Sequence, residues 1–412
     1  MTSIVSPLTR EFIENIKSEG APVIIFGAGI VGEVLFHACR DAGIKVECFC
    51  DNNINKTLSP MCNIEVIHTL NLRAKYRDAV FLISAADIKD VVEQLKVLGY
   101  ARWRAGSLLL KDFDVSRYPF SAPPDFVNFA VGACLLCHDS YLNPEKLFLR
   151  SVDIIITERC SLKCRDCSNL MQYYEKPANC DMKELEQAID TFCAFIDEVH
   201  EFRVIGGEPF MNKEFHLIIK KLLAEPKVKK IVIYTNGTIL PGKEQIEYLK
   251  NSKVLLLITD YGVLSKKLNE LIQILQLNKV AFYARKAQGW TDCAKIMRHY
   301  RSIEQQKEIF RSCCAKNTVT LSRGKLFRCP FSANADRLRA VPNHEDDYIN
   351  IFQKSQGPMD IHEMKNRIRT FLLGKDFLQV CDYCNGRSFG APEIAPAVQT
   401  KVSLEYEKHC SK

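Results

Sequence analysis

Three cysteines stand close together near the middle of the chain, as Cys160, Cys164 and Cys167. They follow the segment VDIIIT, which predicts a buried strand, so all three lie on the loop that leaves this strand. Three thiolates on one loop can bind three irons of a cubane cluster and leave the fourth iron open to another molecule. A structural zinc site needs a fourth protein ligand, so the spacing favours an iron–sulfur cluster.

A second group of cysteines lies nearer the C-terminus. The segment TVTLSRGKLFRCP predicts a β-hairpin that turns at residues 322–324, and a later pair of cysteines is separated by two residues. Thiolates from a hairpin and such a pair can close a site for either zinc or an iron–sulfur cluster, and the residue types leave this choice open. The candidate ligands are Cys329, Cys381, Cys384 and one of Cys313 and Cys314, of which we favour Cys314.

A glycine-rich turn is the third signal. Gly27, Gly29 and Gly32 stand between a predicted strand and a predicted helix, and Asp51 ends the next strand about 20 residues later. Such a turn presents backbone N–H groups to a phosphate, while the acid can bind a ribose hydroxyl. The unit has about half the length of a complete dinucleotide fold, so a nucleotide or nucleotide-sugar, NAD and a purely structural domain all stay open.

Alternating strands and helices must position these residues. Strands and helices alternate over residues 21–110, which predicts a small parallel α/β unit. Residues 113–150 contain prolines and lack clear periodicity, so we expect a linker there. From residue 151, at least five strand–helix units follow one another, and Asp181 is the expected N-cap of the first helix. This series predicts a partial parallel barrel.

The fold class expected from these patterns is α/β with three domains. The expected domains are a Rossmann-like nucleotide-binding domain over 1–112, a linker over 113–150, a partial (β/α) barrel over 151–310 and a small cysteine-rich α+β domain over 311–412.

Composition limits the class of protein. The chain has 412 residues, 47% hydrophobic and 25% charged, as in ordinary globular proteins. The net charge of +7 is spread along the chain, so we expect no nucleic-acid partner. No apolar segment approaches the ~20 residues of a membrane helix, so we expect no membrane partner and a cytoplasmic location. In the reducing cytosol, the 18 cysteines favour metal ligation over disulfides.

A tetrapeptide at the end of the second barrel strand completes a family resemblance. Together with the three-cysteine loop, it resembles the radical S-adenosylmethionine (SAM) superfamily. The resemblance implies that the loop cysteines hold a [4Fe–4S] cluster, that SAM chelates its open iron, and that the tetrapeptide receives the SAM amino group. The family usually has an aromatic residue where this chain has Asp166. The tetrapeptide consists of Gly206, Gly207, Glu208 and Pro209.

Later strand ends add candidate SAM contacts. The segment with Tyr234 and Asn236 resembles the position that contacts the SAM ribose in the family, and Asp260 ends the following strand. A strand end followed by an ordinary Asn-Gly turn is the alternative explanation for Tyr234 and Asp260.

Two further resemblances concern the outer domains. The second cysteine group is similar to the auxiliary-cluster domains called SPASM or twitch, and because only Cys410 follows Cys384, the shorter twitch form with one auxiliary [4Fe–4S] cluster is expected. That cluster can accept an electron from a substrate radical, or it can hold a small domain together. The segment FCDNNINK resembles small nucleotide-sugar-binding domains of bacterial sugar-modifying enzymes.

The radical SAM resemblance implies an enzyme that reductively cleaves SAM to a 5′-deoxyadenosyl radical, which abstracts hydrogen from carbon. We expect a sugar, cyclitol or nucleotide-sugar substrate, undergoing dehydrogenation or epimerisation in polysaccharide or natural-product tailoring, with flavodoxin or ferredoxin as electron donor. Cys293 is a candidate hydrogen-atom donor for epimerisation, with simple packing as the alternative. Maturation of a ribosomally made peptide and a non-catalytic iron–sulfur or zinc scaffold stay open as other functions.

Overall fold

The computed structural model describes residues 6–352, 360–388 and 391–409. The chain divides into two compact units, Met1–Lys146 and Leu147–Lys412. Each unit is an α/β structure built on its own sheet, which confirms the predicted fold class.

The first unit holds five parallel strands in the order β3-β2-β1-β4-β5. This is the order expected of a Rossmann-like sheet. One face packs against α3 and η2, where Leu72, Val91 and Leu95 are buried. The strands are β1 (Val23–Phe26), β2 (Val46–Asp51), β3 (Val66–His68), β4 (Val80–Ile83) and β5 (Trp103–Ala105). The helices are α1 (Pro7–Ser18), α2 (Ile30–Asp41), η1 (Ile54–Leu58), η2 (Thr69–Ala74), α3 (Ile88–Val97), α4 (Ser107–Leu110), η3 (Val115–Arg117) and α5 (Pro124–Leu142).

The expected linker over 113–150 contains a helix of 19 residues, α5, which contacts α2, α3 and α4 and belongs to the first unit. Pro124 occupies the first turn of α5, where a missing N–H costs no hydrogen bond. Apolar residues surround most of this helix, so no 3.6-residue pattern is visible in the sequence.

The second unit is built on an eight-stranded sheet in the order β10-β9-β8-β7-β6-β12-β13-β14. Strands β6 to β10 and β12 run parallel, and the described residues form no closed barrel, in agreement with the predicted partial barrel. The strands are β6 (Phe148–Thr157), β7 (Glu198–Gly206), β8 (Val228–Thr235), β9 (Val254–Asp260), β10 (Phe282–Lys286), β12 (Val319–Ser322), β13 (Lys325–Phe327) and β14 (Tyr348–Asn350), with β11 (Trp290–Thr291) and β15 (Glu393–Ile394) forming a separate antiparallel ribbon.

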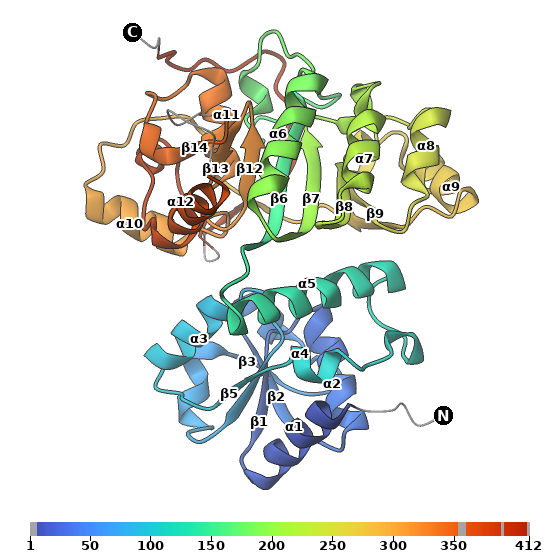
Figure 1. Ribbon diagram of the computed structural model, residues 1–412, viewed down its shortest axis with the longest axis vertical. Coiled ribbons are helices and arrows are strands. Elements are labelled where there is room, and N and C mark those ends of the chain that lie inside the picture. The colour runs from blue at the N-terminus through green and yellow to red at the C-terminus, as the bar shows by residue number, and fades with distance from the viewer. Residues whose placement is uncertain (1–5, 353–359, 389–390, 410–412) are drawn as a thin grey trace. The chain divides into compact units, whose positions relative to one another are not determined.

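Helices α6, α7 and α8 lie along one face of this sheet, and their apolar residues form its main core (Figure 1). Asp181 caps α6 as predicted, because its carboxylate accepts hydrogen bonds from the N–H groups of Lys183 and Glu184. The α-helices are α6 (Met182–Phe195), α7 (Phe215–Ala224), α8 (Lys243–Leu249), α9 (Leu268–Leu277), α10 (Ile303–Ser312), α11 (Pro330–Leu338) and α12 (Ile361–Gly374). The short 3₁₀ helices are η4 (Met171–Tyr173), η5 (Pro209–Met211), η6 (Gly262–Leu264), η7 (Glu345–Asp347) and η8 (Gln379–Asp382).

The predicted hairpin is present as β12 and β13, and it turns through Arg323 and Gly324, both at positive φ. It continues the barrel sheet, because β12 pairs in parallel with β6. Residues 311–409 therefore share one compact unit with the barrel, and their status as a separate domain stays a prediction. No helix in the described part of the chain has the length and apolar character to cross a membrane.

Candidate active site

The predicted cysteine loop leaves the carboxyl end of β6, where strands of a parallel sheet place their functional loops. Cys164 is buried, and Cys160 and Cys167 are half-buried. Two side-chain amides approach the sulfurs: Asn236 Nδ2 lies 3.6 Å from Cys160 Sγ, and Gln399 Nε2 lies 3.2 Å from Cys164 Sγ. The loop sulfurs therefore have hydrogen-bond donors from two distant parts of the chain.

Burial raises the pKa of all three loop thiols, that of Cys164 to about 11. A metal that replaces these protons must offset the cost of burying the thiolates. Three cysteine sulfurs on one loop are the donor type that iron–sulfur clusters use. In the described residues, no three His, Cys, Asp or Glu side chains are grouped as ligands of one metal ion. Each thiolate of a cubane binds a different iron, so its ligands need not converge on one point.

Two glycines form the floor beneath the cysteine loop. A Cβ atom at Gly206 would lie 2.1 Å from the Thr157 carbonyl oxygen, and one at Gly207 would lie 2.1 Å from that of Arg159. The Gly207 N–H donates to Thr157 O at 2.9 Å, and the Glu208 N–H donates to Arg159 O at 2.8 Å. The close approach admits only glycine, and it fixes the start of the loop.

Glu208 is fully buried, and it does not line the cavity that opens beside the cysteine loop. Its carboxylate accepts hydrogen bonds from Thr235 Oγ1 at 2.9 Å, from the Asn236 N–H at 2.8 Å and from the Phe210 N–H at 3.3 Å. The side chain therefore holds the carboxyl end of β8 against the tetrapeptide. Its expected contact with the SAM amino group stays a prediction, as does that of Pro209, which begins η5.

Burial raises the pKa of Glu208 to about 7, although the three hydrogen bonds favour the charged form. The folded chain thus holds this proton more tightly than the unfolded chain does. The resulting stabilisation is fully present below the ordinary pKa of 4.5 and is lost as the pH rises through about 7. We expect an infrared carboxylic-acid band that titrates near neutrality and is missing in Glu208→Gln. A band that titrates below pH ~5, as an ordinary carboxyl does, would contradict the assignment.

A cavity of about 390 Å³ opens beside the cysteine loop. It lies against the strands of the barrel sheet, and the ribbon residue Trp290 and the loop residue Arg387 also contribute to its wall. The Tyr261 and Trp290 rings meet edge to face at 5.9 Å. Its lining includes the three loop cysteines, Gly206 and Gly207, together with Asp153, Arg203, Tyr234, Asn236, Tyr261, Trp290, Cys293 and Arg387.

Asp153 and Arg203 lie directly opposite each other on β6 and β7 and form a two-point ion pair. Arg203 Nη2 donates to Asp153 Oδ2 at 2.8 Å, and Arg203 Nε contacts Oδ1. Asp153 is fully buried, and the guanidinium lies 5.5 Å from the Tyr234 ring centre. This pair was not predicted from the sequence, although a charged residue inside VDIIIT and another inside EFRVIGG were visible signals.

The candidate residues at the ends of β8 and β9 lie in two different places. Tyr234 lines the cavity, and Asn236 both lines it and donates to Cys160. Asp260 instead accepts a hydrogen bond from the Gly262 N–H at 2.7 Å, while Tyr261 faces the cavity. The structure therefore brings Tyr234 and Asn236 to the site and directs the Asp260 carboxylate into a turn.

The second cysteine group converges on Cys329. The Sγ atoms of Cys313, Cys329 and Cys384 each accept a hydrogen bond from a backbone N–H two or three residues later, at 3.3–3.4 Å. Burial raises the pKa of Cys329 well above its usual range, and the nearby charges of Cys381, Cys313 and Cys384 raise it further. Partial burial and the nearby charges therefore associate Cys313 with the other three cysteines, whereas Cys314 is exposed. Which of the two is a ligand stays a prediction, and Cys410 lies outside the described residues.

Cys293 is 6% exposed and lines the cavity. Its carbonyl oxygen lies 3.8 Å from Cys384 Sγ, so this residue stands between the cavity and the second cysteine group. That position suits a hydrogen-atom donor and a packing residue equally.

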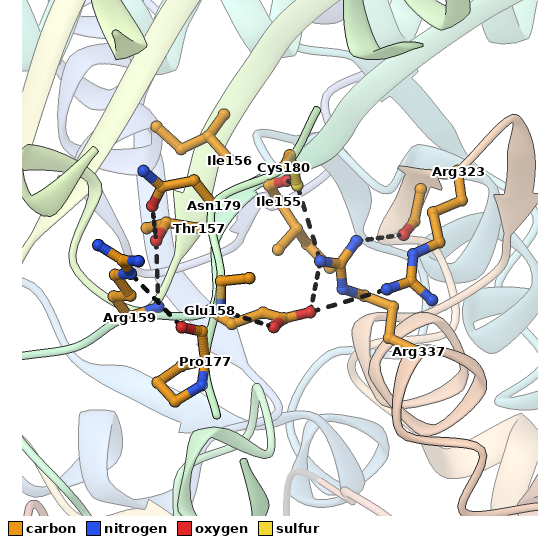
Figure 2. Close-up of polar contacts among 12 residues, drawn as sticks. Ile155, Ile156, Thr157, Glu158, Arg159, Pro177, Asn179, Cys180, Arg323 and Arg337 are labelled. Atoms are coloured by element: carbon orange, nitrogen blue, oxygen red, sulfur yellow. Dashed lines mark hydrogen bonds and ion pairs between the residues drawn. The ribbon is translucent and has the colours of Figure 1, made fainter. Parts of the chain in front are cut away.

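A buried carboxylate ties the cysteine loop to the hairpin and α11 (Figure 2). Glu158 Oε1 accepts from Arg337 Nη2 at 2.6 Å, and Glu158 Oε2 accepts from the Ala178 N–H at 3.0 Å. Arg323 approaches the same carboxylate at 3.9 Å, and Arg337 also lies 3.7 Å from Cys180 Sγ. These contacts connect the segment between β6 and Cys160 to the hairpin turn and to α11. Residues from the C-terminal part of the chain therefore help to hold the cysteine loop in place.

In the first unit, Gly27 and Gly29 lie in the turn between β1 and α2, Gly29 is the helix N-cap, and Gly32 lies in the first turn of α2. Gly27 has φ +111, and a Cβ there would lie 2.6 Å from Ser84 Oγ. A Cβ at Gly32 would lie 2.0 Å from the Gly27 carbonyl oxygen. The turn therefore requires glycine for its own packing, whether or not it binds a phosphate.

Asp51 is already engaged within this turn. Its Oδ2 accepts from the Ala28 N–H at 2.9 Å and from Lys56 Nζ at 2.8 Å, and its Oδ1 accepts from the Asn53 N–H at 2.9 Å. The carboxylate thus braces the glycine turn and holds the Lys56 ammonium near it. The expected contact with a ribose hydroxyl stays a prediction.

Residues 154–263 match the family model of the Radical SAM superfamily. Curated relatives include the GTP 3′,8-cyclase of Stenotrophomonas maltophilia, 32% identical over 89 residues, which are 21% of this chain and 27% of the relative. The GTP 3′,8-cyclase of Clostridium acetobutylicum is 33% identical over 100 residues, covering 22% of this chain and 30% of the relative. The chain thus matches about a third or less of these relatives' length.

Two solved structures also resemble the chain. BtrN in complex with AdoMet and 2-DOIA is 16% identical, covers 63% of this chain and 98% of its own, and has a TM-score of 0.36. SuiB of Streptococcus suis bound to S-adenosylmethionine is 15% identical, covers 58% and 52% respectively, and has a TM-score of 0.29.

Proposed function

We propose that this chain, whose residues 154–263 match the Radical SAM superfamily model, is an enzyme that abstracts hydrogen from a sugar, cyclitol or nucleotide-sugar. The observation that carries the proposal is the cavity, because one space is bordered by the cysteine loop, the two glycines and a polar and aromatic wall. The family implies a [4Fe–4S] cluster and SAM as cofactors.

In this proposal, Cys160, Cys164 and Cys167 hold the cluster, and the backbone of Gly206 and Gly207 lies where the resemblance places the SAM amino group. When bound, the cluster and SAM supply a carbon-centred radical that removes hydrogen from unactivated carbon. The chain supplies binding, orientation and exclusion of water. Partly buried hydrogen bonds from Asn236 and Gln399 to the loop sulfurs contribute to that positioning.

The chemistry of the cavity wall supports a hydroxyl-rich substrate. The Arg203 side chain is partly exposed and lines the cavity, so its guanidinium presents N–H donors to hydroxyl groups, while the buried Asp153 carboxylate neutralises its charge. The Tyr261 and Trp290 rings offer flat apolar surfaces to the C–H face of a sugar ring. A few convergent polar groups beside aromatic rings are typical of small-molecule sites.

We assign the second cysteine group to an auxiliary [4Fe–4S] cluster held by Cys313, Cys329, Cys381 and Cys384. The backbone N–H donors on three of these sulfurs support it, since such hydrogen bonds stabilise thiolates and tune cluster potentials. The cluster would receive an electron from the substrate radical in a dehydrogenation. Epimerisation, with Cys293 donating the hydrogen, is the second possibility for the same cavity.

This assignment predicts different results for two adjacent cysteines. Cys313→Ala should lower the iron content from about eight to about four atoms per chain, because one sulfur of the second cluster is lost. Cys314→Ala is the matched control, and it should keep all the iron, because its side chain is exposed. Iron analysis of the anaerobically purified variants measures both. Iron loss in Cys314→Ala alone would reverse the assignment, and one zinc with no second set of irons would replace the cluster by a structural zinc site.

The first unit is proposed to bind a nucleotide or nucleotide-sugar. The glycine turn and the Lys56 ammonium held beside it by Asp51 support a phosphate contact. For the whole enzyme, we also propose a cytoplasmic location and a flavodoxin or ferredoxin that reduces the cluster on the cysteine loop.

Deuterium transfer tests the substrate class. Reduced protein is incubated with SAM and with ring-deuterated sugars, cyclitols or nucleotide-sugars, and the 5′-deoxyadenosine is analysed for deuterium by mass spectrometry. Deuterium gained from one of these compounds supports the proposal. Transfer only from a peptide, or turnover only of GTP, would overturn the sugar assignment and leave the radical chemistry in place.

A further inference from the structure

The C-terminal segment returns to the cysteine loop and pairs with it. The Arg165 N–H donates to Val398 O at 2.7 Å, and the Thr400 N–H donates to Lys163 O at 2.8 Å. Cys164 and Gln399 face each other in an antiparallel bridge between these two bonds. The segment around Gln399, more than 200 residues away along the chain, is therefore hydrogen-bonded to the backbone on both sides of Cys164, a proposed cluster ligand.

The Gln399 side chain bridges the loop backbone and a sulfur. Its Oε1 accepts from the Lys163 N–H at 2.8 Å, which fixes the opposite end of the amide as the NH₂ group. That Nε2 donates to Cys164 Sγ at 3.2 Å and to Ala397 O at 2.7 Å. Every polar atom of the amide has a partner, so its orientation is determined.

Further contacts keep the segment in place on the same loop. Lys163 Nζ donates to Ser403 Oγ at 2.8 Å, and the Leu404 N–H donates to Gln172 O at 2.9 Å. The Tyr406 ring packs edge to face against Tyr173 at 5.5 Å. The segment covers Cys164, which is 8% exposed.

We propose that Gln399 is a positioning residue that sets the reduction potential of the cluster on Cys160, Cys164 and Cys167. The inference rests on the proposed function, because it requires a cluster at this loop. A reduced cluster carries one more negative charge than the oxidised one, and part of it resides on the cysteine sulfurs. An N–H group that donates to a ligand sulfur stabilises the reduced cluster more than the oxidised cluster, and it therefore raises the reduction potential.

Two substitutions separate this electrostatic role from simple attachment. Gln399→Glu keeps the size and the oxygen that accepts from Lys163, but it places an oxygen and a negative charge beside Cys164 Sγ. Gln399→Met keeps the volume without charge or donor. Thr400→Val is the matched control in the same segment, since the Thr400 hydroxyl donates to Val402 O and does not contact the loop.

The experiment is a redox titration of the anaerobic full-length protein followed by electron paramagnetic resonance. The cluster with the open iron is identified as the one whose reduced signal changes when SAM is added. With unchanged iron content, the midpoint potential should shift downward in Gln399→Met and further downward in Gln399→Glu, and it should stay at the wild-type value in Thr400→Val.

Equal potentials in wild type and both Gln399 variants would overturn the inference while leaving the proposed function intact. Loss of this cluster from both variants would also overturn it, in favour of a purely structural role for the segment. A wild-type protein with no SAM-responsive cluster would overturn the proposed function instead.

Discussion

Replacement of Cys160, Cys164 and Cys167 together by alanine should lower the iron content from about eight to about four atoms per chain. These three residues supply every protein ligand to the first cluster in this account, so no partial site remains after the replacement. The second cluster uses a separate set of sulfurs around Cys329, so its iron should stay. Iron and acid-labile sulfide on anaerobically purified protein measure the change.

A double variant of Cys62 and Cys137 is the control, because it removes two half-buried thiols that belong to neither group. It should keep the full iron content. A fall from about four irons to none in the loop variant, with one zinc retained, would reduce the second site to a structural one. No iron in the wild-type protein, even after reconstitution, would contradict the account of the loop.

Loss of one partner from the Asp153–Arg203 pair should produce the largest effect on stability. Arg203→Met leaves the fully buried Asp153 carboxylate without its two-point partner. Breaking a buried ion pair in this way costs about 3–5 kcal/mol, because the remaining charge stays desolvated. The variant should also bind substrate poorly, since both residues line the cavity.

Hydrogen–deuterium exchange of β6 and β7 measures this cost locally, without requiring two-state unfolding of a chain with two compact units. Protection of these amides should fall about a hundredfold or more in Arg203→Met. The double variant Asp153→Leu/Arg203→Met should recover much of the protection, because it leaves no buried charge. Wild-type protection in the single variant would show that the pair contributes little.

The sequence predicted those features that local patterns determine. Alternation of apolar strands with amphipathic helices predicted the parallel sheet, the Asp181 cap and the hairpin at Arg323 and Gly324, because each depends on neighbouring residues. The loop cysteines were identifiable because their spacing and the preceding strand are contiguous in the sequence.

Features that depend on distant pairing were not predictable. Asp153 and Arg203 meet only because β6 and β7 pair in one particular register. Gln399 reaches Cys164 through a bridge between segments that are far apart in the sequence.

Side-chain direction was the other feature that the sequence could not determine. Cys313 and Cys314 are adjacent at the end of α10, where Cys313 is the C-cap. The backbone there leaves the Cys313 side chain half-buried and the Cys314 side chain exposed. Asp260 and the following Tyr261 also differ in direction where β9 ends, since the Asp260 carboxylate accepts from the Gly262 N–H and Tyr261 lines the cavity. The helix α5 was missed because apolar residues on most of its sides conceal the helical period.

Cleavage of SAM by the reduced protein tests the central claim most directly. Anaerobic wild-type protein with dithionite and SAM should form 5′-deoxyadenosine and methionine, detected by mass spectrometry, whereas the Cys160/Cys164/Cys167→Ala variant should form neither. If fully iron-loaded wild-type protein is reduced and still leaves SAM intact, the chain is an iron–sulfur scaffold and the account of its activity is wrong.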